Sequence, residues 1–184
     1  MDDEVLRDMW ITSWGKSPKH AGILYKLGTQ FSIPTRVNYY NTFCLPYFSY
    51  NIVHWGGTNS CHLYPLITLQ KRIIRTVAGK NFLDHTTPLY HDLKILKILD
   101  LYKFQSVVDT YSKLLNGHYK PTHNLVTRNN NMAVPKFQRL TRTQQSLTYR
   151  GPSYWNDLPE NIRGLDSLGK FKKAVKDYYI DQYI

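Results

Sequence analysis

Histidine and cysteine side chains gather between residues 44 and 62, and these residue types often bind metals or act as nucleophiles. His54, Cys61 and His62 lie close together in the sequence, with Cys44 farther upstream. A structural zinc site normally takes four thiolate or imidazole ligands at short, regular intervals, and this spacing matches no such pattern. We therefore expect no metal ion, and we expect both cysteines to be free thiols.

Patterns of the common catalytic sites are also missing from the sequence. There is no Gly-x-Ser-x-Gly nucleophile elbow and no glycine-rich phosphate loop. The acidic cluster 2–4 lies among the first residues, outside any hydrophobic strand that could fix two divalent ions for nucleotidyl transfer. The sequence thus predicts no catalytic residue and no cofactor, and we expect this chain to be inactive as an enzyme by itself.

Positive charge is the main chemical feature that remains. Lysine and arginine outnumber aspartate and glutamate by 24 to 13, which gives the 184 residues a formal charge of +11. This balance favours acidic partners, and the composition supports nucleic-acid binding. The alternative is an ordinary solvated surface. Six cations are the expected phosphate contacts, three on a predicted helix and three in a predicted loop region: Lys71, Arg72, Arg75, Arg128, Arg139 and Arg142.

Apolar residues recur at helical spacing over most of the first two thirds of the chain. The best-defined helix runs from Leu63 to Ala78, with Gly79 as its cap and with Gln70 beside the cations on its solvated face. A helix from Ser32, disturbed at Pro46, is expected to bury Val37, Tyr40, Phe43 and Cys44. Further helices are predicted over Lys16–Gly28, Leu89–Leu96 and Leu101–Asn116, the last with Asp100 as its cap.

The pattern changes after Gly117, where prolines and three successive asparagines replace the helical spacing. Ser146–Tyr149 alternates like a short strand, and Met132–Phe137 is its expected hairpin partner. Gly151–Pro159 has the composition of turns, and a last helix follows Ser167. Trp155 and Phe171 are expected in the core.

The predicted fold class is mainly α, a helical bundle with a small β-hairpin or extended segment near residues 130–150. We divide the chain into a poorly patterned N-terminal segment, 1–15, and a helical region, 16–117. Residues 118–184 form a loop and short-strand segment and a C-terminal helix packed on the same domain.

An ordered series of short strings along the chain resembles the region just after the polymerase core of LINE-type reverse transcriptases, which non-long-terminal-repeat retrotransposons encode. The resemblance extends from about Ile23 to near the C-terminus, and the order of the strings is more specific than any one of them. The strings are Ile23–Leu27, Tyr39–Tyr40, Leu45–Tyr50, Trp55–Gly56, Leu69–Arg75, His85–Tyr90, Leu93–Leu96, Leu101–Tyr102, Thr127–Arg128, Gly151–Pro152, Trp155–Pro159 and Phe171–Lys172.

This resemblance implies a thumb-like, post-polymerase helical region of an RNA-directed DNA polymerase, with 16–117 as the thumb-like part. The paired aspartates of the family's catalytic palm have no equivalent in this chain, so the resemblance carries over no catalytic residue. The expected function is sequence-tolerant binding of RNA or of an RNA–DNA primer–template duplex.

Two other interpretations remain open. The first is a helical protein-interaction module that docks on another protein, such as a polymerase core in trans, through the exposed aromatic residues Tyr47, Tyr50 and Trp55. The second is a non-functional transposon relic. No apolar run reaches the roughly 18 residues of a membrane span, and the first residues lack the order of a signal peptide. We therefore expect no membrane partner and an intracellular protein, in the nucleus, the cytoplasm or both.

Overall fold

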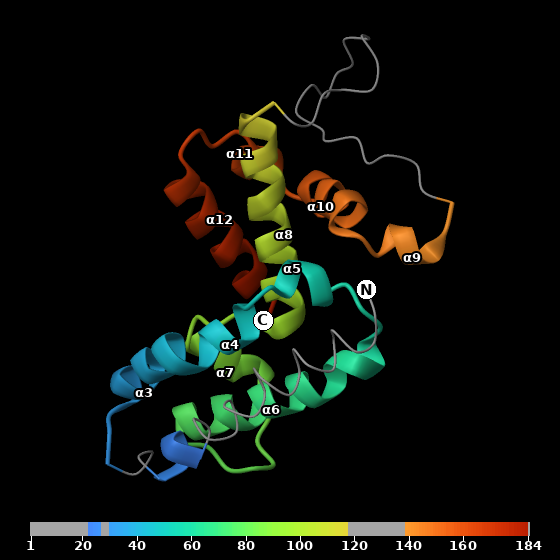
Figure 1. Ribbon diagram of the computed structural model, residues 1–184. Coiled ribbons are helices and arrows are strands. Elements are labelled where there is room, and N and C mark those ends of the chain that lie inside the picture. Colours follow the sequence, from blue (N-terminus) through green and yellow to red (C-terminus); the bar gives the residue numbers. More distant parts are fainter. Residues whose placement is uncertain (1–21, 27–29, 118–138, 184) are drawn as a thin grey trace.

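The computed structural model describes residues 22–26, 30–117 and 139–183 (Figure 1). Over these residues the chain is mainly helical and contains no strand, which confirms the predicted mainly α fold class. Residues 22–26 are helical. The named elements are α3 (Ile33–Tyr39), the π-helix η1 (Tyr40–Cys44), α4 (Leu45–Ser49), α5 (Ile52–Trp55), α6 (Ser60–Ala78), α7 (Thr87–Asp92), α8 (Ile98–Leu115), α9 (Thr141–Gln144), α10 (Leu147–Asn156), α11 (Glu160–Arg163) and α12 (Leu168–Asp181).

Helix α8 is the centre of the arrangement. Helices α10 and α12 flank it, and α4, α5 and α6 also contact it (Figure 1). Three aromatic rings join α8, α10 and α12: Tyr111 stacks on Phe171 with ring centroids 4.3 Å apart, and Trp155 lies 5.5 Å from Phe171. Trp155 and Phe171 are buried, as predicted.

Helix α6 follows the predicted apolar spacing. Leu66, Ile73, Ile74 and Val77 are buried, and the helix begins three residues before the predicted Leu63, at Ser60. It ends at Gly79, as predicted, where a φ of 67° is the left-handed conformation that glycine adopts without steric cost. The amide of Lys80 then donates to the carbonyl of Arg75 at 2.9 Å, which satisfies one of the last helical acceptors.

Gln70 occupies the interior, and the prediction of a solvated position for it is wrong. Its side chain is 1 % exposed. Its Nε2 donates to the Tyr40 hydroxyl at 3.0 Å and to the Leu96 carbonyl at 2.9 Å. Its Oε1 accepts from the Tyr90 hydroxyl and from the Ile98 amide, both at 3.1 Å. One amide therefore ties α6 to η1, to α7 and to the start of α8.

The predicted strand at Ser146–Tyr149 is also wrong, because these residues form the cap and first turn of α10. Leu147, Gly151 and Trp155 recur every four residues, which puts them on one helical face, and this helix packs along α8. Burial of that helical face stabilises the helix more than the alternating pattern of Ser146–Tyr149 favours a strand. Gly151–Asn156, predicted as turns, is the second half of the same helix. The expected hairpin partner, Met132–Phe137, lies outside the described residues.

Several helix limits differ from those predicted. Helix α7 covers Thr87–Asp92 rather than Leu89–Leu96, because Lys94 adopts a φ of 52° that no helix continues through. Helix α8 begins at Ile98, so Lys97 and not Asp100 occupies the cap position. Of the predicted helix Lys16–Gly28, the described part is residues 22–26.

The second predicted helix starts as expected, with Ser32 at its cap and Pro34 in the first turn. Tyr40 and Cys44 are buried, whereas Phe43 is exposed, contrary to the prediction. The disturbance expected at Pro46 takes the form of the π-turn η1, in which the Leu45 amide donates to the Tyr40 carbonyl five residues back. Helical structure then continues through Pro46 in α4.

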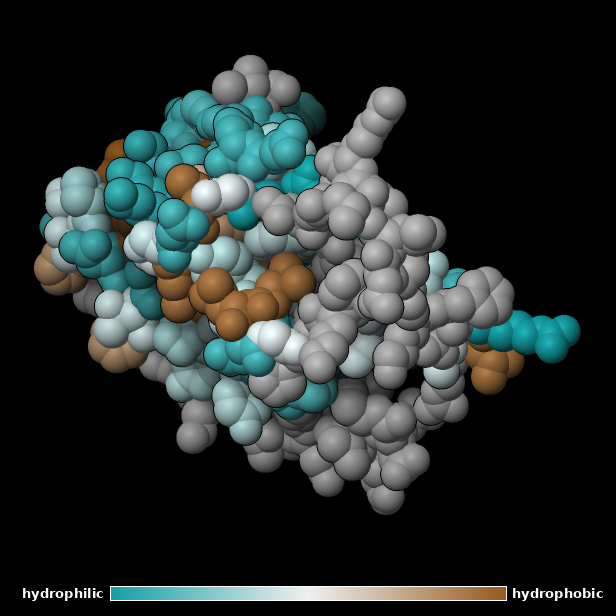
Figure 2. Space-filling model, turned by 90° about the horizontal axis from the view of Figure 1, so that it is seen from above, coloured by the Kyte–Doolittle hydropathy of each residue, from teal (hydrophilic) through white to brown (hydrophobic). Residues whose placement is uncertain are grey.

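The visible surface of the described residues is mixed in character. Seen from above, hydrophilic side chains predominate, with a narrower hydrophobic strip among them (Figure 2). No helix among the described residues has the length and apolar content that a membrane span requires.

Candidate anion-binding site

Three of the predicted phosphate contacts lie together in the C-terminal half of α6. Lys71 and Arg72 are exposed, and Arg75 is half-buried. Gln70, Ile73 and Ile74 are buried on the inner face of α6. The cations at the intervening and following positions therefore point outward. Arg75 also has a structural contact, since its Nε donates to the Asp84 carbonyl at 2.9 Å.

That contact fixes the loop between α6 and α7 against α6. Within the loop, the Asp84 carboxylate accepts from the Asn81 amide at 2.8 Å. The loop presents Phe82 to solvent with 68 % of its surface exposed. The guanidinium carbons of Arg75 and Arg72 lie 5.6 and 6.0 Å from the centre of its ring, within the range of cation–π attraction.

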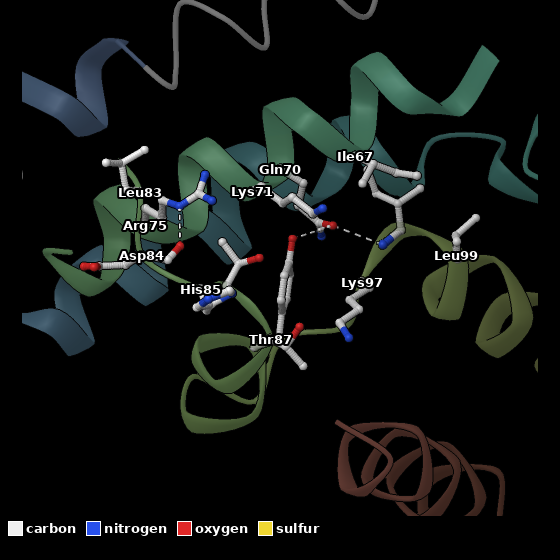
Figure 3. Close-up of a pocket in the computed structure, with 13 residues that line it drawn as sticks. Ile67, Gln70, Lys71, Arg75, Leu83, Asp84, His85, Thr87, Lys97 and Leu99 are labelled. Carbon is white, nitrogen blue, oxygen red and sulfur yellow. Dashed lines mark hydrogen bonds between the residues drawn. The ribbon is translucent and has the colours of Figure 1, made fainter. Parts of the chain in front are cut away.

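A cavity of about 530 Å³ lies between α6, this loop, α7 and the start of α8 (Figure 3). In the close-up, Arg75 and Leu83 lie toward one end, Ile67 and Leu99 toward the other, and Lys97 between them. Lys71 also lines the cavity, and Asp84 is the acidic residue among its lining. The cavity thus combines apolar side chains with three cations.

Lys97 is held in the cavity by aromatic rings. Its Nζ lies 4.0 Å from the ring centre of Tyr183 and 5.9 Å from that of Tyr90. Its backbone amide donates to the Tyr183 hydroxyl at 3.0 Å, which in turn donates to Asp100 Oδ2 at 2.8 Å. Partial burial lowers the pKa of Lys97, Asp100 opposes this shift, and the nearby positive charge of Lys71 adds to it. Two ammonium groups therefore face the same small volume.

Two carboxylates lie near this cluster, since Asp84 lines the same cavity and Asp100 acts on Lys97, but neither forms an ion pair with it. Among the described residues, no ion pair involves Lys71, Arg72, Arg75 or Lys97. Asp100, the carboxylate that influences Lys97, is paired with Lys103 at 3.1 Å. Neighbouring like charges without an ion-pair partner favour a bound anion, and phosphate is the anion that lysine and arginine commonly bind.

The other predicted contacts lie elsewhere. Arg139 is exposed just before α9, and Gln145, just after α9, donates to Asn59 at the start of α6 with a distance of 3.2 Å. Arg75 follows Asn59 by 16 residues, or about 24 Å along a helix that rises ~1.5 Å per residue. Arg139 is described by the structure but is not one of the residues that line the cavity. Arg142 belongs to α9, but its side chain, like the whole of Arg128, lies outside the described part.

The residues first considered for metal chemistry do not converge. In the described ranges, no group of three or more His, Cys, Asp or Glu side chains could hold a metal ion. Cys44 is buried and Cys61 is exposed, and both are free. Burial raises the pKa of the Cys44 thiol to about 12, so this cysteine is a neutral, unreactive core residue.

Lys97 and Phe82 are functional candidates that the sequence analysis missed. Neither belongs to a helical stripe, because Phe82 lies in the loop after α6 and Lys97 lies at the cap position of α8. Comparison with protein-family models, with curated proteins and with solved structures found no match.

Proposed function

We propose that this chain derives from the thumb-like, post-polymerase region of a LINE-type reverse transcriptase and that it binds RNA or RNA–DNA duplex without sequence preference. The ordered series of strings from Ile23 to Phe171 supports the origin. The absence of the family's paired aspartates from the sequence makes binding, rather than polymerisation, the proposed role of this chain.

The cluster of Lys71, Arg72, Arg75 and Lys97, which forms no ion pair among the described residues, is the observation that supports binding best. Phosphate contacts position a nucleic acid but do not read its bases, so such a cluster implies sequence tolerance. Each cation that displaces a counterion from a duplex contributes about 0.9 units to the slope of log affinity against log salt.

The test is a fluorescence-anisotropy titration of the full chain with a labelled RNA hairpin and an RNA–DNA duplex at several salt concentrations. The double variant K71Q/R72Q removes two cations whose side chains make no hydrogen bond within the described part of the chain, and it is expected to reduce the slope by about 1.8 units. The matched control is K172Q/K173Q, which removes two exposed charges from α12. Equal losses in both variants would contradict a localised site.

The interaction-module alternative has less support after the aromatic residues are placed. Trp55 is buried, contrary to the prediction of an exposed docking residue, and its Nε1 donates to the Tyr50 carbonyl at 2.7 Å. Tyr47 is half-buried, and Tyr50 is exposed. Salt-insensitive self-association, with no nucleic-acid binding at low salt, would favour this alternative. A polymerase core in trans is a further partner that the proposed origin suggests.

A further inference from the structure

The feature that goes beyond a general phosphate contact is the position of Phe82. A side chain that is 68 % exposed gains little from folding, yet its loop is anchored by the Arg75–Asp84 and Asn81–Asp84 hydrogen bonds. The two arginines beside the ring add positive charge around a flat apolar surface. A base has two apolar faces and is attached to an anionic backbone, so it matches this combination.

In a duplex both faces of an internal base are already stacked, and the phosphates lie on the outside. Phe82 can stack only on a base that is unpaired or at an end. The adjacent cavity favours the same ligand, because Lys71 and Lys97 line a hollow whose walls include Ile67 and Leu99. A flexible single strand can place a backbone phosphate at these two cations while one of its bases stacks on Phe82, which a rigid helix does less readily.

Arg75 connects the two features. Its guanidinium carbon is 5.6 Å from the Phe82 ring centre, and the same side chain lines the cavity. The stacking surface and the cations of the cavity are therefore parts of one continuous site on α6, the loop that follows it and the start of α8.

We propose that this site binds a short unpaired segment of nucleic acid, with a base stacked on Phe82 and a backbone phosphate held in the cavity by Lys71 and Lys97. This inference rests on the proposed function and makes it more specific, because it selects single strands or unpaired overhangs over continuous duplex.

The experiment compares a labelled 12-nucleotide single-stranded RNA with a blunt RNA–DNA duplex, using anisotropy and the full chain. F82L removes the aromatic face but keeps an apolar side chain. The matched control is Y64L, because Tyr64 is 69 % exposed and lies in the N-terminal half of α6, the helix that precedes the loop of Phe82. Circular dichroism of each variant checks that it is folded.

F82L is expected to weaken single-strand binding at least about five-fold, which corresponds to the lower end of base–aromatic stacking energies. F82Y, which keeps the aromatic face, is expected to bind as the original protein does. K97Q is expected to lower the single-strand salt slope by about 0.7 units. Duplex affinity should change little with F82L.

Single-strand affinity that is the same in F82L and Y64L would overturn this inference. If K71Q/R72Q still reduced the duplex salt slope in that case, the proposed function would stand without it. Loss of duplex and single-strand affinity in equal measure with F82L would also overturn it, because stacking would then not distinguish the two ligands. An absence of binding to every nucleic acid at low salt would refute both proposals.

Discussion

Replacing Gln70 tests the arrangement on which the candidate site is built. In Gln70→Leu, four buried groups lose their partner: the hydroxyls of Tyr40 and Tyr90, the carbonyl of Leu96 and the amide of Ile98. A buried polar group left without a partner costs about 1–3 kcal/mol. Taking the lower value for each, because some of the four groups can relax toward solvent, gives a loss of about 4 kcal/mol in the free energy of unfolding.

Urea denaturation followed by circular dichroism measures this loss. With a denaturant slope of ~2 kcal/mol per molar, the midpoint should fall by about 2 M. The matched control is Lys71→Leu, one residue along the same helix at an exposed position, which should change stability by less than about 0.5 kcal/mol. If the two variants differed by less than about 1 kcal/mol, the four hydrogen bonds would not stabilise the fold as the geometry implies.

Gln70→Glu adds a pH dependence to the same test. The new carboxyl keeps the shape of glutamine, but burial favours its neutral form and raises its pKa in the folded state. The folded protein then binds more protons than the unfolded one, so stability is highest below the unfolded pKa of about 4.3 and falls as the pH rises toward the folded pKa. A stability difference from the original protein that is the same at pH 4 and pH 7 would contradict this placement.

Two further variants or treatments test the packing. In urea denaturation, Gly151→Ala should lower the free energy of unfolding by about 1–3 kcal/mol, because a Cβ there would lie 2.5 Å from Thr110 Oγ1. The control is Gly169→Ala, where the nearest atom to the new Cβ is 4.0 Å away. That variant should be neutral or slightly stabilising. A thiol reagent at pH 8 should label Cys61 at once and Cys44 only after denaturation, because Cys44 is buried and its pKa is raised to about 12. Mass spectrometry that found both cysteines labelled in the native protein would be inconsistent with this core.

Local spacing explains why α6 could be predicted and where that prediction failed. Leu63, Leu66, Ile73 and Val77 lie on one face of the helix, and position 70 continues the same seven-residue repeat. The period therefore places Gln70 inside, but its polarity led to the opposite assignment. A buried glutamine needs partners from distant segments, and helical spacing does not reveal those.

In the candidate site too, some residues could be placed from helical spacing and others only from contacts between distant segments. Lys71, Arg72 and Arg75 are neighbours because one helix carries them, which sequence spacing predicts. Phe82 and Lys97 join them only because the loop after Gly79 folds back and because Gln70 fixes the start of α8. The start of helix α10 was predicted as a strand for a related reason. Its packing against α8 determines its conformation, and the alternating pattern of four residues does not reveal that packing.

The contact between Lys97 and Tyr183 sets an order of events during synthesis. The two residues are separated by 86 positions, so a growing chain carries the exposed cations of α6 well before it carries the ring that holds Lys97. At translation rates of roughly 5–20 residues per second, the 108 residues between Arg75 and Tyr183 take roughly 5–22 s. During that interval the nascent chain has a basic helix, but Lys97 lacks the Tyr183 ring that later packs against its ammonium group.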